Sequence, residues 1–317
     1  MKQLIPVIVG LLIAVFQPLA AAESYLVMES HSGKVLLAAN PEQKRPIASL
    51  TKMVTSKVVL DWARVSQTNL STIITVPPTA LSFGGRNPMG LRPGDRMTLR
   101  NAIYSAMMGS DNIAAYAMAD YVGRSLLAKR GRSGDPQNEF VAEMNHLAKA
   151  LRMRKTRFVN PHGLELPGKK AYSTASDMAR MSVHAMRDVG FAFYVKQKSR
   201  SIDVIGVDGS KRAFKVSNTN SLLGAMGVNG IKTGFTAAAG QCIAINSHRR
   251  PLVKKIDDTR SQIRKRDLIV VILGSADRIG RPKQLISQAW PLYDQWAASG
   301  YPVSPKGKEL IIVPQLR

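Results

Sequence analysis

Residues Arg45 to Ser56 read "RPIASLTKMVTS" and place Ser49 and Lys52 three residues apart at the predicted start of a helix. Residues i and i+3 share one helix face, so the lysine amine can reach the serine hydroxyl. A helix N-terminus also supplies free N–H groups and a positive potential, which stabilise an oxyanion. The pair therefore predicts a nucleophile with its base, provided that burial and a second cation lower the lysine pKa. About one such pair is expected by chance in a chain of this size.

A second cation is available in "NGIKTGFTAAAG", where Lys232, Thr233 and Gly234 follow one another in a predicted edge strand. Average residue usage gives this tripeptide in about one chain in ten or fewer. Gly234 has no Cβ, so a substrate backbone could approach the strand closely. Lys232 and Thr233 would then present a charge and a hydroxyl to a carboxylate. A strand and turn without function is the competing interpretation.

Between these two motifs lies "MMGSDNIAAYA", which contains Ser110, Asp111 and Asn112. A polar triplet in an apolar helical stretch usually marks a cap or a turn. Its hydroxyl and carboxamide could also bridge the two lysines and hold a substrate amide. Each motif occurs once, and their combination in this order is typical of penicillin-binding proteins and class A β-lactamases.

Strand-like segments at both ends of the chain flank a helical middle. This order predicts an α/β (α+β) chain with one sheet assembled from the two chain ends, helices on its faces and an inserted helical lobe. The basic segment from His248 to Asp267 is expected to be an elongated charged hairpin loop. A kink or break is expected at Pro291 in the last helix.

The first 22 residues predict a secretory signal peptide cut after Ala22, because the apolar run from Leu4 to Phe16 is too short to span a bilayer. A retained membrane anchor is the alternative. We expect a periplasmic or extracytoplasmic protein with a catalytic domain at 23–300, its helical lobe at roughly 62–198, and a C-terminal tail at 301–317. Cys242 is the sole cysteine, so no intramolecular disulfide can form, and we expect it to be buried in a strand.

The net charge of +24 is extreme, and a surface of this kind should bind polyanions. The basic residues cluster at Arg124–Arg132, Lys149–Arg157 and Arg249–Arg266. Nucleic acid is disfavoured, because aromatic residues make up only 6% of the chain and no motif that reads RNA or DNA is present. Anionic cell-wall polymers or a membrane surface are the favoured partners. Solvated surface charge without a specific partner is the alternative.

The sequence resembles the low-molecular-mass penicillin-binding proteins, the D-alanyl-D-alanine carboxypeptidase family of S11 serine peptidases. The likeness runs from about Ser24 to Gln288 and includes "TRFVNPHGL" and "YSTASDMARM". It implies a DD-peptidase fold of the serine β-lactamase-like type, action on peptidoglycan stem peptides, inhibition by β-lactams, and no metal or organic cofactor. The 317-residue chain ends 83 residues after Gly234, so it looks closest to the penicillin-binding protein 7 branch, which is associated with DD-endopeptidase activity.

By that resemblance, Ser49 attacks the carbonyl of the penultimate D-alanine and Lys52 takes its proton. Ser110 would relay a proton to the leaving amine, and backbone N–H groups would form the oxyanion hole. The substrate-binding residues that the resemblance implies are Asn112, Lys232, Thr233, Gly234 and Phe235. His162 lies in a turn signal, and we expect it to have a structural role.

Three alternatives stay open at this point. A class A β-lactamase needs a deacylating glutamate in an E-x-x-N loop, but no glutamate between Ser110 and Lys232 has asparagine three residues on. Slow penicillin hydrolysis is therefore predicted. The second alternative is a catalytically weak basic cell-wall-binding protein, and the third is a nucleic-acid-binding protein. Whether the enzyme is a carboxypeptidase, an endopeptidase or both is also left open, because both reactions share one acyl-enzyme step.

Overall fold

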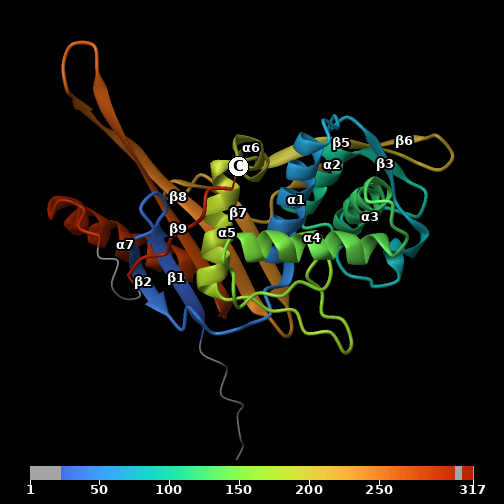
Figure 1. Cartoon of the computed structure of the whole chain (residues 1–317), viewed down its shortest axis with the longest axis horizontal. Coiled ribbons are helices and arrows are strands. Elements are labelled where there is room, and N and C mark those ends of the chain that lie inside the picture. Colours follow the sequence, from blue (N-terminus) through green and yellow to red (C-terminus); the bar gives the residue numbers. More distant parts are fainter. Residues whose placement is uncertain (1–22, 304–308, 317) are drawn as a thin grey trace, which may run out of the picture.

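The two ends of the chain meet in one five-stranded antiparallel sheet, as predicted, with strand order β2-β1-β9-β8-β7 (Figure 1). The computed structural model describes residues 23–303 and 309–316, so the expected signal peptide lies outside the described residues. Strand β1 (Ser24–Glu29) pairs with both β2 (Val35–Ala39) and β9 (Ser261–Ser275). Strand β7 (Val228–Thr236), which carries the Lys-Thr-Gly motif, is the edge strand that the sequence predicted.

The remaining elements connect the two halves of this sheet and build the lobe beside it. Single turns of tighter or wider helix occur at Ala48–Leu50, Pro78–Leu81 and Ser105–Gly109. The other helices and strands are α1 (Thr51–Val65), β3 (Ile73–Thr75), β4 (Arg96–Thr98), α2 (Leu99–Tyr104), α3 (Asn112–Lys129), α4 (Pro136–Ala150), α5 (Ala175–Arg187), α6 (Val189–Val195), β5 (Ser199–Ile205), β6 (Lys211–Ser217), β8 (Gly240–Lys255) and α7 (Gly280–Ala298).

Both faces of the five-stranded sheet are covered, and β9 shows why its sequence is a continuous apolar run. Successive side chains of a strand point to opposite faces. Leu268, Val270 and Ile272 belong to the core beneath α7, whereas the alternate residues Ile269 and Val271 belong to the core shared with α1 and α5. A strand buried on both faces needs apolar residues at every position. Cys242 of β8 is fully buried in the second of these cores, as expected.

A second sheet corrects the expectation of a single one. Strands β5 and β6 pair with the short strands β3 and β4 in the lobe, in the order β3-β4-β5-β6. Only one face of this sheet meets the lobe core, which it reaches through Ile202, Val204 and Val216. The other face is exposed, so β5 and β6 have the alternating pattern of a half-buried pair rather than that of the central sheet.

The basic segment from His248 to Asp267 is an elongated hairpin, as predicted, but it consists of paired strands rather than a loop. Strands β8 and β9 continue together as far as Lys255 and Ser261 and project well beyond the rest of the molecule (Figure 1). Helix α7 runs unbroken through Pro291, so a break at that residue does not occur. None of the helices in the described part of the chain is long and apolar enough to cross a membrane.

Candidate active site

Ser49 and Lys52 lie where a 3₁₀ turn passes into α1, close to the helix start that the sequence predicted. Lys52 is fully buried, and its amine donates to Ser49 Oγ at 2.9 Å, to Asn112 Oδ1 at 2.7 Å and to the carbonyl oxygen of His162 at 2.7 Å. Burial lowers the pKa of Lys52 to about 7, although the nearby Asp111 carboxylate opposes the shift. The amine is therefore close enough, and weakly enough protonated at neutral pH, to accept the serine proton.

The Ser-Asp-Asn motif interrupts the helix that the sequence predicted across it. Ser110 adopts a left-handed backbone conformation with φ of 60°, and α3 begins directly after Asp111. Asp111 Oδ1 accepts the backbone N–H groups of Ile113 at 2.9 Å and Ala114 at 3.0 Å, so this residue caps α3. Ser110 and Asn112 instead reach the two lysines. Asp111 is therefore a helix cap, as the first interpretation predicted, and Ser110 and Asn112 contact the lysines, as the second predicted.

Lys232 is the second buried cation, and it holds Ser110 as Lys52 holds Ser49. Its amine donates to Ser110 Oγ at 3.0 Å and to the carbonyl oxygen of Thr233 at 2.9 Å. Burial sets the pKa of Lys232 well below its usual value, and the positive charges of Lys52, Arg86 and Arg278 lower it further. The positive charge of Lys52 therefore disfavours the charged form of Lys232. The cation that adds to the effect of burial on the pKa of Lys52 is Arg86 and not the predicted Lys232.

Gly234 brings strand β7 against the turn that carries Ser49. A Cβ at this position would lie 3.0 Å from Ser49 N and 3.1 Å from the carbonyl oxygen of Ile47. No other residue type fits this approach without movement of the backbone. The strand therefore presents its backbone, together with the neighbouring Thr233, directly beside Ser49. Thr233 Oγ1 lies 2.7 Å from Thr219 Oγ1, so two hydroxyls stand together at this wall.

These residues surround one cavity of about 620 Å³. Of the eight predicted site residues, six line it, and the two lysines lie behind Ser49 and Ser110. The described residues of its lining include no aspartate or glutamate and are Ser49, Gly85, Arg86, Ser110, Asn112, Leu164, Thr219, Thr233, Gly234, Phe235, Thr236, Gln241 and Arg278. Nowhere in the described chain do three His, Cys, Asp or Glu side chains gather as a metal site would require.

Five polar side chains of this cavity escaped prediction, namely Arg86, Thr219, Thr236, Gln241 and Arg278. Arg86 belongs to the Gly/Pro-rich stretch and donates from Nε to the carbonyl oxygen of Gly109 at 2.5 Å. That bond fixes its guanidinium beside the Ser-Asp-Asn motif. The glycines around Arg86 were the available signal, because they let a loop backbone approach the site: a Cβ on Gly85 would meet Asn112 Nδ2 at 2.2 Å.

His162 has the structural role that its sequence context predicted. Its Nδ1 accepts the backbone N–H of Leu164 at 3.2 Å, and its ring stacks on Phe83 with centroids 4.3 Å apart. Burial, with a smaller contribution from the positive charge of Lys52, lowers the pKa of His162 to about 3. The ring is therefore neutral at physiological pH, and the backbone carbonyl of this residue is the group that reaches Lys52.

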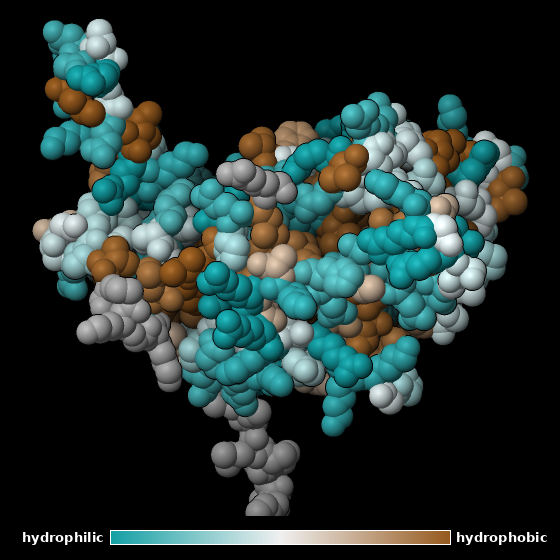
Figure 2. Space-filling view, in the orientation of Figure 1, coloured by the Kyte–Doolittle hydropathy of each residue, from teal (hydrophilic) through white to brown (hydrophobic). Residues whose placement is uncertain are grey.

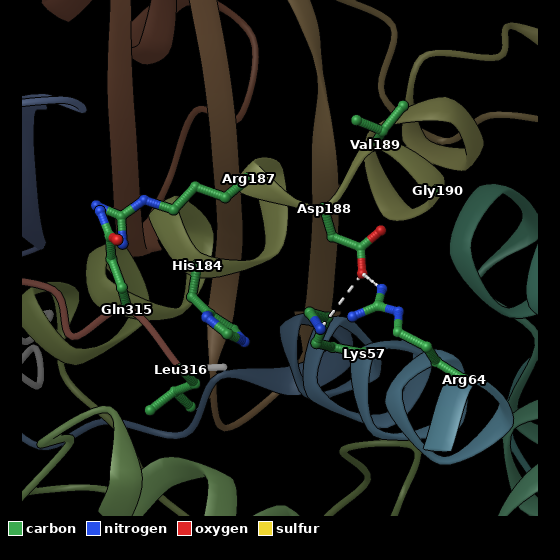
Figure 3. Close-up of a pocket in the computed structure, with 9 residues that line it drawn as sticks. All are labelled: Lys57, Arg64, His184, Arg187, Asp188, Val189, Gly190, Gln315 and Leu316. Atoms are coloured by element: carbon green, nitrogen blue, oxygen red, sulfur yellow. Dashed lines mark hydrogen bonds and ion pairs between the residues drawn. The ribbon is translucent and has the colours of Figure 1, made fainter. Parts of the chain in front are cut away.

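A second cavity, of about 640 Å³, lies behind α1 and is lined by none of the motif residues (Figure 3). Asp188, between α5 and α6, accepts from Arg64 at 2.6 Å and lies 3.3 Å from the amine of Lys57, and both cations belong to α1. Helix α6 in turn packs on β7, where Val195 lies against Gly230. This cluster of charges thus connects the helix of Ser49 with the strand of Lys232.

Comparison with known proteins agrees with this geometry. The sequence profile of the D-alanyl-D-alanine carboxypeptidase family matches residues 13–252. D-alanyl-D-alanine carboxypeptidase DacC of Escherichia coli is 32% identical over 269 residues, which cover 83% of this chain and 59% of DacC. The chain therefore spans less than two thirds of the length of this relative. A D-alanyl-D-alanine endopeptidase of Pseudomonas aeruginosa is 30% identical over 230 residues, which cover 72% of this chain and 67% of the relative.

The fold is also found in a solved structure. The Streptomyces K15 DD-transpeptidase superposes with a TM-score of 0.67 at 25% sequence identity, covering 90% of this chain and 99% of that one. The predicted fold class is thus confirmed: antiparallel sheets flanked by helices in the arrangement of the DD-peptidases, which is the serine β-lactamase-like fold. With a family profile that matches most of the sequence, the chain belongs to the D-alanyl-D-alanine carboxypeptidase family of peptidases.

Proposed function

We propose that this chain is a serine DD-peptidase that acts on peptidoglycan stem peptides through an acyl-enzyme on Ser49. One observation carries the proposal: the buried amine of Lys52 lies 2.9 Å from Ser49 Oγ, and its pKa is lowered to about 7. A base with a pKa near the working pH combines a large neutral fraction with enough basicity to take a proton. The serine hydroxyl alone would be a poor nucleophile at that pH.

In the proposed acylation, Ser49 Oγ attacks the carbonyl carbon of the penultimate D-alanine while its proton passes to Lys52. The backbone N–H groups of Ser49 and Phe235 stabilise the oxyanion of the tetrahedral intermediate. The close approach of Gly234 to Ser49 N supports this arrangement, because it sets β7 beside the nucleophile. When the C–N bond breaks, Ser110 gives the leaving amine a proton, which it regains from the lysines.

Substrate binding is proposed to use the remaining motif residues. Thr233, beside Thr219, suits the carboxylate of the terminal residue, and the buried amine of Lys232 lies behind this wall, where it donates to the carbonyl oxygen of Thr233. Asn112 positions the peptide amide of the substrate. Water then attacks the ester carbonyl and its proton passes to the amine of Lys52. Lys52 gives this proton to Ser49 Oγ as the C–O bond breaks, and the product leaves with its free carboxylate.

The choice between carboxypeptidase and endopeptidase activity is best tested with defined muropeptides. We propose that the chain has one or both of these activities, because relatives of this chain include proteins named for each activity. Monomeric pentapeptide and cross-linked dimer should be digested separately and the products identified by mass. Loss of one alanine or conversion of dimer to monomer, each absent with Ser49→Ala, is expected. Unchanged products with Ser49→Ala would overturn the role of Ser49.

β-Lactams are proposed to acylate the same serine and to leave it slowly. A class A β-lactamase deacylates through a glutamate, whereas the cavity lining of the described chain holds no carboxylate. Water at the ester would therefore lack a second base. Rapid penicillin turnover without a detectable adduct would favour the β-lactamase alternative instead.

The location and the surface charge complete the proposal. We propose export by residues 1–22, a catalytic domain at 23–300 and a tail at 301–317. The lobe, predicted at roughly 62–198, also includes β5 and β6 of the second sheet. The net charge of +24 is proposed to draw the enzyme to anionic wall polymers or to a membrane surface outside the cytoplasm. Retention on such a polyanion should weaken steeply as salt rises.

A further inference from the structure

The arm formed by Arg249–Arg266 leaves the central sheet as a free two-stranded ribbon (Figure 1). Pairing of β7 with β8 ends at Ser247, and pairing of β1 with β9 ends at Leu268. Beyond these points, the strands of the arm have no other strand partner within the described chain. A two-stranded ribbon buries little apolar surface and is marginal by itself. Packing in the hydrophobic core therefore does not explain the length of the arm.

The arm is strongly basic. It holds eight lysine and arginine residues and two aspartates. Both aspartates lie at the turn and are paired locally, Asp257 with Arg260 at 2.6 Å and Asp258 with Lys255 at 2.6 Å. Such exposed pairs contribute little to stability. The acidic charge of the arm is thus confined to its tip. Arg249 pairs with Asp294 and Arg264 lies over the ring of Tyr301, whereas the flank lysines Lys254, Lys255 and Lys265 are exposed to the solvent.

Apolar side chains stand exposed among these cations. Val253 and Ile263 are directly opposite each other in the strand register, so they lie on one face, where they are 63% and 64% exposed. Because strand residues alternate between faces, Lys255 and Lys265 flank this pair on the same face. Figure 2 shows the projecting arm as hydrophobic groups set in a hydrophilic surface. Lysines alone would protect free strand edges from aggregation, but they do not explain an exposed valine–isoleucine pair.

We propose that the arm binds an anionic lipid surface, with Val253 and Ile263 entering the boundary between headgroups and acyl chains. Lys255 and Lys265 would lie along the apolar pair and reach the phosphates with their amines, and Lys255 would exchange its solvent-exposed pair with Asp258 for a phosphate. A hydrated anionic polymer would attract the lysines equally but would gain nothing from the exposed pair. An anionic lipid surface therefore matches both the apolar pair and the lysines of this face, whereas an anionic polymer matches only the lysines.

The position of the arm suits this role. Residue 242 of β8 pairs with Gly234 beside the active site, and residue 254 lies about 40 Å further along the same strand at the usual rise per residue. A membrane contact at the arm would leave the catalytic cavity open toward the wall. The inference rests on the proposed function outside the cytoplasm. Of the two anionic partners proposed there, wall polymers and a membrane surface, it selects the membrane surface.

Sedimentation with vesicles tests the proposal on the purified full chain. Vesicles of phosphatidylcholine with phosphatidylglycerol should bind the protein, and vesicles of phosphatidylcholine alone should bind it much less. The double variant Val253→Ser with Ile263→Ser should lose about tenfold in affinity, and Lys255→Gln with Lys265→Gln a similar factor. The matched controls are Val189→Ser with Val207→Ser and Lys211→Gln with Lys215→Gln, which alter exposed residues elsewhere and should leave binding unchanged.

Two results would overturn the assignment. One is equal vesicle binding by the serine double variant and the wild type. The other is equal binding of the wild type to vesicles with and without phosphatidylglycerol, which would show that the arm does not recognise anionic lipid. Hydrolysis of a soluble muropeptide should be the same in all variants, because the arm lies far from the cavity. Absence of hydrolysis in every protein, with vesicle binding retained, would count against the proposed function and not against the arm.

Discussion

Lys52 donates to Ser49 across 2.9 Å from a position that is closed to solvent. Burial lowers the pKa of Lys52 to about 7, so the neutral amine becomes the main form as pH rises above that value. We expect the acylation rate constant with a β-lactam to rise about tenfold per pH unit below this pKa and to level off above it. Stopped-flow acylation between about pH 5 and pH 9 measures this profile. A flat profile would contradict Lys52 as the base.

A matched variant separates the proton transfer from the positive charge. Lys52→Arg keeps a cation near Ser49, but a guanidinium is not deprotonated in proteins. Acylation should therefore fall at least about a hundredfold at every pH, within the range typical for loss of a general base. Recovery of wild-type rates at high pH in this variant would show that another group accepts the proton.

Gly234→Ala should impair acylation without unfolding the chain. The added methyl group would lie 3.0 Å from Ser49 N, so β7 must move away from one of the two proposed oxyanion donors. Loss of one such donor typically costs about a hundredfold or more in rate. The acylation rate constant and the thermal melting curve should be measured together. A normal rate with a normal melting curve would show that the strand can shift at no cost to the oxyanion hole.

The site was largely predictable because its motifs are short and local. The spacing of Ser49 and Lys52 set their contact, whereas the contact of Lys232 with Ser110 joins residues 122 positions apart and could be expected only from the combination of motifs. Arg86 and Arg278 were not predicted. The paths of two loops bring them to the cavity, and those paths have no periodic signature in the sequence.

The fold was predictable to a similar extent. The apolar strands at both chain ends indicated a shared sheet, and β9 supplied its continuous apolar run. The lobe sheet was missed because β3 and β4 are three residues long, too short for an alternating pattern. The basic arm was expected to be a hairpin loop rather than paired strands, since dense charge hid the alternation of strands that pair only with each other.

Acid should destabilise the fold partly through His162. Its pKa is about 3 in the folded chain, against an ordinary 6.5, so between these values the unfolded chain binds more protons at this residue. Stability therefore falls as pH drops through that window, by about 2 kcal/mol at pH 5 from His162. His162→Asn keeps an acceptor for Leu164 N but does not titrate. Urea unfolding at pH 7 and pH 5 should show a smaller loss in the variant, and equal losses would contradict this assignment.

Asp188 should matter to stability more than an exposed carboxylate. It accepts from Arg64, pairs with the buried Lys57 and caps α6 through the N–H of Phe191 at 3.1 Å. We expect Asp188→Ala to lower the free energy of unfolding by about 2–4 kcal/mol. Asp294→Ala is the matched control, since its pair with Arg249 is solvent-exposed and should change stability by less than about 1 kcal/mol. Similar losses in the two variants, measured by urea unfolding, would argue against a supporting role for Asp188.

Intact-mass measurement after incubation with benzylpenicillin tests the assignment of Ser49 most directly. We predict a mass increase of one penicillin molecule that persists over the incubation, because the described cavity lining offers no carboxylate as a second base, beside Lys52, for the deacylating water. Peptide mapping should place the added mass on Ser49, and Ser49→Ala should remain unmodified. An unmodified wild-type chain, or an adduct that survives the Ser49→Ala substitution, would contradict Ser49 as the nucleophile.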